Sequence, residues 1–177
     1  MNKLSTRNLT LAGLFIAFGL LLPFLTAQIP SLGNKFLPMH IPVLISGFVC
    51  GWRYGLAIGL TVPIFRSLLF GMPPMFPVAA AMAVELAVYG GMTGILYKLL
   101  PKKTVSVYIA LIAAMLCGRV AWGGASILLY GLGGMPYTWE LFIAGAFFNA
   151  IPGIAVQLII VPALAIALQK AGVMRYE

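Results

Sequence analysis

The sequence predicts an all-α integral membrane protein, a six-helix bundle with both termini in the cytoplasm. Apolar residues make up 62% of the 177 residues, and the mean hydropathy is +1.06. Only 8% of the residues are charged, whereas a soluble domain carries about 25%. The apolar residues form long runs that suit helices crossing a hydrocarbon core of roughly 30 Å. The period-two alternation of β-barrel strands is absent.

We expect one transmembrane domain over residues 1–177, built from six helices. The second and third helices are short, and the third contains Pro63. Short or proline-interrupted helices often line cavities, because neighbouring protein or water must satisfy the freed backbone groups. The sixth helix is long, with bends expected at Pro152 and Pro162. The predicted helices cover about residues 8–28, 39–51, 54–70, 78–99, 106–130 and 140–168.

Basic residues predict the topology. With six helices and the N-terminus in the cytoplasm, the outer loops hold only Lys35. Basic residues favour the cytoplasmic side, so this count predicts a multi-pass protein of the plasma membrane. It also explains the net charge of +8 without a nucleic-acid partner. The basic residues on the inner side are Lys3, Arg7, Arg53, Lys98, Lys102, Lys103, Lys170 and Arg175.

Polar residues within the apolar runs predict a binding site. A charge in hydrocarbon is costly, and it is usually paired, faces a cavity or has a function. At about 1.5 Å per residue, five such residues from five helices lie in the outer half of the membrane. This predicts a polar pocket that is open to the outside, whereas a channel needs polar lining along its whole length. The five residues are His40, Arg66, Glu85, Arg119 and Asn149.

The charges of these residues predict an anionic ligand. Two arginines accompany one glutamate, so one positive charge is left for a ligand held by a guanidinium group. Alternatively, either arginine extends to the lipid headgroups or binds carbonyls at a helix end. Glu85 is then the structural partner of Arg119 or Arg66.

Two further residues near this site have alternative interpretations. His40 either contacts the ligand or is an interfacial histidine with satisfied hydrogen bonds. Trp122 lies three residues after Arg119, on the same face of the helix. Its ring either stacks on a flat part of the ligand or packs in the core.

Small residues on the first helix predict a close helix contact. Ala12, Gly13 and Ala17 lie near one another, and Gly13 and Ala17 are four residues apart. Such pairs let another helix approach closely. The face they form either packs inside the bundle or docks onto a separate protein.

The sequence holds no catalytic constellation. There is one histidine, and neither paired carboxylates nor a phosphate-binding Walker A loop is present. Cys50 and Cys117 lie within or at the edge of apolar runs, without metal-ligand spacing. We therefore expect no enzymatic activity, no cofactor and no metal site. Active transport by this chain would need an ATPase from elsewhere.

The chain resembles the substrate-binding S components of energy-coupling factor (ECF) vitamin transporters over nearly its whole length. The resemblance rests on the six short hydrophobic helices, the small-residue face, and the run MHIPVLISGFVCGWRYGLAIGLTVPIFRSLLFGMPPMFP followed by AMAVELAVYGGMTGILY. The family docks its coupling subunit through an Ala-x-x-x-Ala motif. Gly13 and Ala17 match that motif here, with glycine in place of the first alanine.

The resemblance implies a vitamin bound from outside, a transmembrane coupling (T) subunit, two ATPase subunits, and toppling of the S component in the membrane to release the ligand. Together with the arginine excess, it predicts an anionic vitamin such as pantothenate. The alternatives are another vitamin, such as riboflavin, folate or pyridoxine, or a small membrane enzyme or structural subunit. A self-sufficient secondary transporter is a further alternative, but six helices are few for inverted repeats.

Overall fold

The computed structural model describes residues 6–26, 36–148 and 150–174. In these ranges the chain forms seven α-helices and no strand, which confirms the all-α prediction. Two five-residue segments, η1 (Leu22–Thr26) and η3 (Ala144–Phe148), have a different helical pitch, and a third, η2 (Met75–Ala79), is kinked, with extended backbone at Phe76. The α-helices are α1 (Thr6–Leu21), α3 (His40–Cys50), α4 (Trp52–Phe70), α5 (Ala80–Leu99), α6 (Thr104–Leu132), α7 (Trp139–Ile143) and α8 (Ile151–Lys170).

Five helical stretches of the described chain are long and apolar enough to cross a membrane. This supports the prediction of a multi-pass membrane protein. The five stretches are Thr6–Leu25, Trp52–Phe70, Met75–Leu99, Thr104–Leu132 and Ile151–Lys170.

The second predicted span, residues 39–51, is not one of these five stretches. It forms α3, whose 11 residues extend about 16 Å, half of the roughly 30 Å hydrocarbon core. Every α3 residue except Ile41 is buried, and α3 packs against α1, α4, α5 and α8. It is a short helix enclosed by the others, so the count of six spanning helices is not confirmed.

The prediction of one continuous sixth helix over residues 140–168 is wrong. The chain instead forms α7, the π segment η3 and a separate α8. Pro152 lies in the first turn of α8, where its missing N–H costs no helical hydrogen bond. This proline therefore begins a helix and does not bend one. Pro162 lies inside α8, which continues through it.

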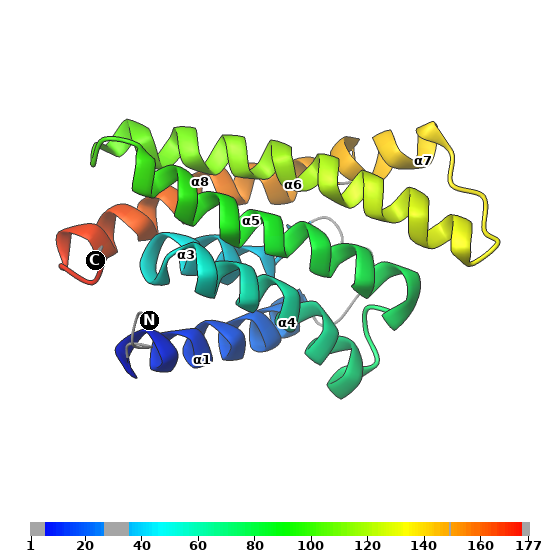
Figure 1. Ribbon diagram of the computed structural model, residues 1–177, viewed down its shortest axis with the longest axis horizontal. Coiled ribbons are helices and arrows are strands. Elements are labelled where there is room, and N and C mark those ends of the chain that lie inside the picture. Colours follow the sequence, from blue (N-terminus) through cyan, green and yellow to red (C-terminus); the bar gives the residue numbers. More distant parts are fainter. Residues whose placement is uncertain (1–5, 27–35, 149, 175–177) are drawn as a thin grey trace.

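Helix α5 is at the centre of the bundle, between α4 and α6 (Figure 1), and it also packs against α3. Glycines bring the backbones of α4 and α5 into contact. A Cβ added at Gly90 would lie 2.2 Å from the carbonyl oxygen of Gly55, and one at Gly59 would lie 2.2 Å from that of Leu86. Such close crossings are typical of membrane helices. Because Leu86 follows Glu85, the Gly59 crossing also fixes the position of Glu85.

The crossing at Gly90 gives a prediction about stability. We expect Gly90→Ala to destabilise the fold by about 1–3 kcal/mol, since the added methyl group meets backbone atoms that cannot move aside. Gly91→Ala is the matched control, because a Cβ there lies 3.7 Å from the Leu56 side chain, an ordinary contact. Thermal unfolding of both purified variants in detergent checks this. Equal stability of the two variants would contradict the described packing.

One end of the bundle is basic. The start of α1, the α3–α4 junction, the α5–α6 connection and the end of α8 all lie at this end (Figure 1). The α4–α5 and α6–α7 connections lie at the opposite end. The first group of segments includes Arg7, Arg53, Lys98, Lys102, Lys103 and Lys170.

Candidate functional site

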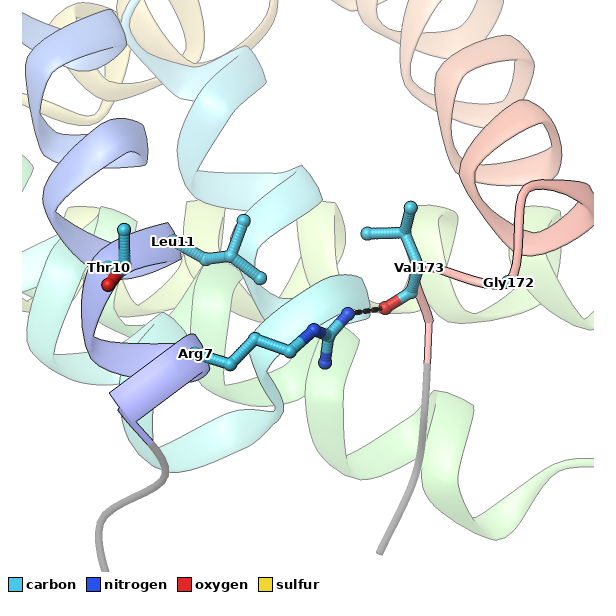
Figure 2. Close-up of a pocket in the computed structure, with 5 residues that line it drawn as sticks. All are labelled: Arg7, Thr10, Leu11, Gly172 and Val173. Carbon is cyan, nitrogen blue, oxygen red and sulfur yellow. Dashed lines mark hydrogen bonds between the residues drawn. The ribbon is translucent and has the colours of Figure 1, made fainter.

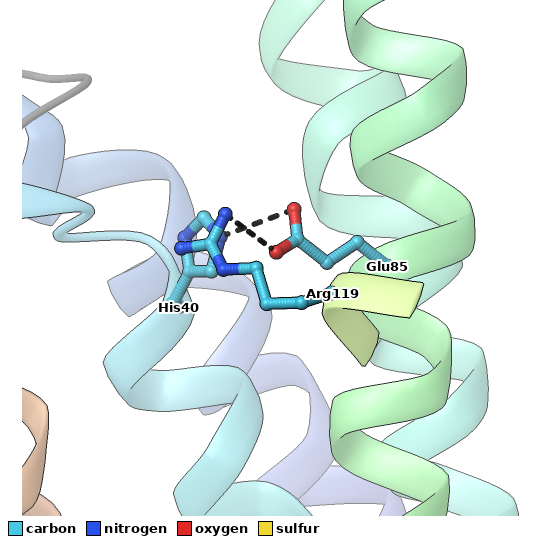
Figure 3. A network of polar contacts seen from close by, with 3 residues as sticks. All are labelled: His40, Glu85 and Arg119. Carbon is cyan, nitrogen blue, oxygen red and sulfur yellow. Dashed lines mark ion pairs between the residues drawn. The ribbon is translucent and has the colours of Figure 1, made fainter. Parts of the chain in front are cut away.

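Glu85 of α5 is the centre of a buried polar cluster (Figure 3). Its Oε1 atom lies 3.1 Å from Nη1 of Arg119 on α6, and its Oε2 atom lies 3.7 Å from Nε2 of His40 at the start of α3. The exposed fractions of His40, Glu85 and Arg119 are 0%, 2% and 6%. Three helices therefore bring together three of the residues predicted to form a site. Of the pairings that the sequence left open for Glu85, the structure forms the one with Arg119.

Close packing of α5 and α6 places the two charges side by side. A Cβ added at Gly118 would lie 2.1 Å from the ring of Tyr89, so α6 approaches α5 closely at the residue before Arg119. Tyr89 is fully buried, and its ring lies 5.6 Å from that of His40 in an edge-on arrangement. The sequence analysis did not select Tyr89. Its spacing of four residues from Glu85, on the same helix face, was the available signal.

Several polar atoms of this cluster are buried without a hydrogen-bond partner. They are Nε and Nη2 of Arg119, Nδ1 and Nε2 of His40, the Tyr89 hydroxyl, and Oε1 of Glu85, whose contact with Arg119 is an ion pair. A buried donor left unpaired costs about 1–3 kcal/mol, more when charged, so each such group calls for a partner that satisfies it, such as a ligand, an ion or a water molecule. Nε and Nη2 lie on the same edge of the guanidinium group and point their N–H bonds in parallel. This edge is suited to grip a carboxylate through two hydrogen bonds.

Arg66 makes its described contacts elsewhere. Its Nη1 atom donates a hydrogen bond of 2.7 Å to the carbonyl oxygen of Leu20, near the end of α1. Its guanidinium carbon lies 5.3 Å from the ring centres of both Phe24 and Phe70. Arg66 therefore takes the helix-end alternative that the sequence left open. In the described structure, Glu85 therefore pairs with Arg119 and not with Arg66.

Trp122 contacts the segment that follows α6. Its ring stacks on that of Phe142 at 6.1 Å and meets Tyr137 edge-on at 6.4 Å. A Cβ added at Gly145 would lie 2.7 Å from the Trp122 ring, so α7 and η3 approach α6 closely here. Partial burial in this aromatic group raises the pKa of the Tyr137 hydroxyl. These contacts correspond to the packing alternative for Trp122. Asn149 lies outside the described residues.

The three small residues of α1 do not share one face. Ala12 is 7% exposed and belongs to the hydrophobic core, so for this residue the structure corresponds to the alternative of packing inside the bundle. Gly13 and Ala17 are exposed. A Cβ added at Gly13 meets no atom within 4 Å. The inward stripe of α1 is formed by Ala12, Phe15 and Gly19, and the Gly13–Ala17 face points away from the bundle.

A pocket opens at the basic end of the bundle (Figure 2). Arg7, Thr10 and Leu11 line it from the start of α1, and Gly172 and Val173 line it from the chain after α8. The guanidinium group of Arg7 donates a hydrogen bond to the carbonyl oxygen of Val173, which joins the two ends of the chain. None of the residues predicted to contact a ligand lines this pocket, and we assign no ligand to it.

A family model described as "ECF transporter, substrate-specific component" matches residues 7–165. The matched range includes α1 with its exposed small-residue face and all three residues of the buried cluster. No curated protein and no solved structure gives a significant match to the chain.

Proposed function

Because the chain belongs to the family of substrate-specific components of ECF transporters, we propose that it captures a small anionic vitamin, with pantothenate as the first candidate, from outside the cell. Members of this family are the substrate-binding subunits of importers, and they are not enzymes. They work with a T component and with ATPases, which supply the energy for transport.

The strongest support for an anionic ligand is the edge of the Arg119 guanidinium group that has no hydrogen-bond partner. Glu85 occupies Nη1 and holds the guanidinium group in place, while Nε and Nη2 remain without a partner. A ligand carboxylate would accept a hydrogen bond from each of these atoms, and it would satisfy two buried donors at once. Nδ1 of His40, whose Nε2 atom faces Glu85, is a further group for hydrogen bonding to the ligand.

The residues selected from the sequence have different roles in the proposed binding site. Arg119, Glu85 and His40 form the site, with Tyr89 packed against His40. Trp122, three residues after Arg119 on α6, packs against Phe142. Asn149 precedes α8 and remains a proposed ligand contact because of its place in the sequence.

The proposed topology puts both termini in the cytoplasm. Two features support it: both ends of the described chain lie at one end of the bundle (Figure 1), and that end carries the basic connections. If α3 is counted as a short, enclosed crossing beside the five long stretches, the chain crosses the membrane an even number of times. An even number of crossings puts both termini on the same side. The α4–α5 and α6–α7 connections then face outward, and the ligand enters from that side.

The proposed partner surface is the exposed face of α1. Gly13 and Ala17 allow a helix of the T component to approach closely. This face is directed away from the bundle's own core, so docking would not compete with internal packing.

Mass spectrometry of small molecules released from gently purified protein tests the function as a whole. We expect a stoichiometric vitamin with a carboxylate group. A folded sample that releases no vitamin, and that gives no binding heat with any B vitamin, would contradict the proposal. A substrate-dependent reaction by the isolated chain would instead favour a membrane enzyme.

A further inference from the structure

Arg66 is a buried charge that the ligand site described above does not use. It is 3% exposed, on the last two turns of α4. Its three described contacts all involve the end of α1 or the end of α4: the Leu20 carbonyl oxygen, the Phe24 ring of η1 and the Phe70 ring. The two rings also touch each other, edge to face, with centres 5.1 Å apart.

The end of α1 has backbone carbonyl groups that need a hydrogen-bond donor, and Arg66 is such a donor. The last carbonyl groups of an α-helix have no partner within the helix, and no water is available in hydrocarbon to replace it. α1 ends at Leu21, and η1 follows with Pro23, which has no N–H to donate. Arg66 supplies a donor to Leu20 from a neighbouring helix. Its positive charge also suits the negative end of the α1 dipole.

A second contact holds the same end of α1 on the same face of α4. A Cβ added at Gly19 would lie 2.8 Å from the Val62 side chain, so the two helices are close at this level. Val62 and Arg66 are four residues apart and adjacent on the α4 surface. Together they hold Gly19 and Leu20. The Gly13–Ala17 face belongs to the same helix, about one to two turns before Leu20.

We propose that Arg66 is a positioning residue: it holds the end of α1 and η1 on α4, and thereby sets the angle at which the Gly13–Ala17 face meets its partner. The first half of this proposal rests on contacts within the chain alone. The second half rests on the proposed function. In this account Arg66 affects assembly with the T component, and Arg119 affects ligand binding.

The test uses Arg66→Gln in the full chain, read by hydrogen–deuterium exchange in detergent. We expect exchange of the backbone amides around η1 to rise by about tenfold or more, because local opening becomes easier when the carbonyl loses its partner. Arg66→Lys keeps a charged donor but loses the flat group that contacts both rings, so it should restore part of the protection. Unchanged exchange in Arg66→Gln would overturn the proposal.

Two further measurements separate positioning from ligand contact. In calorimetric titration with pantothenate, we expect Arg66→Gln to bind within about threefold of the unchanged chain, a difference well below the tenfold that corresponds to one lost strong contact. Co-purification with the T component should fall at least severalfold. A tenfold loss of pantothenate affinity, with normal co-purification, would make Arg66 a ligand contact and overturn the assignment.

A second variant covers the case in which Arg66→Gln does not fold. Phe70→Leu removes one flanking ring at a position that is 38% exposed and leaves the hydrogen bond to Leu20 in place. It should raise exchange at η1 in the same direction, by a smaller factor. If the unchanged chain bound neither vitamin nor T component, the proposed function would fail. The exchange data would still decide whether Arg66 holds α1.

Discussion

Arg119→Ala is expected to weaken vitamin binding at least tenfold, or about 1.4 kcal/mol. The reason is that the free edge of the guanidinium group is the proposed grip on the ligand's carboxylate. The variant also leaves Glu85 buried beside His40 without its arginine. Removing one partner of a buried ion pair generally destabilises the fold by about 3–5 kcal/mol, because the other charge stays buried and unpaired. Calorimetric titration of the purified variant measures the effect.

Arg119→Lys is the informative companion variant. Lysine keeps the positive charge near Glu85, but it lacks the planar pair of parallel N–H donors. We therefore expect affinity to stay well below that of the unchanged chain, with stability closer to normal than in Arg119→Ala. Thermal unfolding in the absence of ligand separates the two effects. Unchanged affinity in both variants would remove Arg119 from the site.

Gly13→Leu is expected to leave vitamin binding intact and to abolish uptake. A Cβ added at Gly13 meets no atom of the chain within 4 Å, so a side chain fits there without displacing its neighbours. It would instead project from the exposed face of α1 and hold a partner helix away. Binding is measured on the purified chain. Uptake is measured in liposomes or cells that contain the T component and the ATPases.

Gly124→Leu provides a matched control for this experiment. Gly124 is also an exposed helical glycine with no atom within 4 Å of an added Cβ, but it lies on α6. A leucine there should leave both binding and uptake unchanged. Normal uptake with Gly13→Leu, or equal loss with both variants, would show that the α1 face is not the specific docking surface.

The fold class and the pairing of Glu85 with an arginine, either Arg119 or Arg66, were predictable from the sequence because they follow from the cost of polar groups in hydrocarbon. Long apolar runs predict membrane helices, and a glutamate with an arginine at similar depth predicts an ion pair. Glu85 and Arg119 form that pair. The depth of a residue in the membrane, however, does not fix the direction of its side chain. Spacing along a helix places Arg66 at a level in the membrane, but it does not say which neighbour its side chain faces, and Arg66 contacts Leu20.

Other details depend on neighbours that the sequence pattern does not identify. Apart from His40 and Ser46, the residues of α3 are apolar on all sides, and an enclosed short helix gives nearly the same pattern as a lipid-facing one. Ala12 and Gly13 are consecutive and both small, yet one is in the core and the other is exposed. Pro152 was expected to bend a helix because apolar residues continue on both sides of it. Its place in the first turn of α8 became evident only from the helix boundaries.

The affinity of the purified chain for pantothenate and for pantothenol, measured side by side by calorimetric titration, tests the central claim most directly. Pantothenol has the same skeleton but carries an alcohol in place of the carboxylate, so it lacks the group that Arg119 is proposed to grip. We predict that pantothenate binds and that pantothenol binds at least about tenfold more weakly, with the difference lost in Arg119→Ala. Equal binding of both compounds, or binding only of an uncharged vitamin, would contradict the claim that the buried guanidinium group selects an anionic ligand.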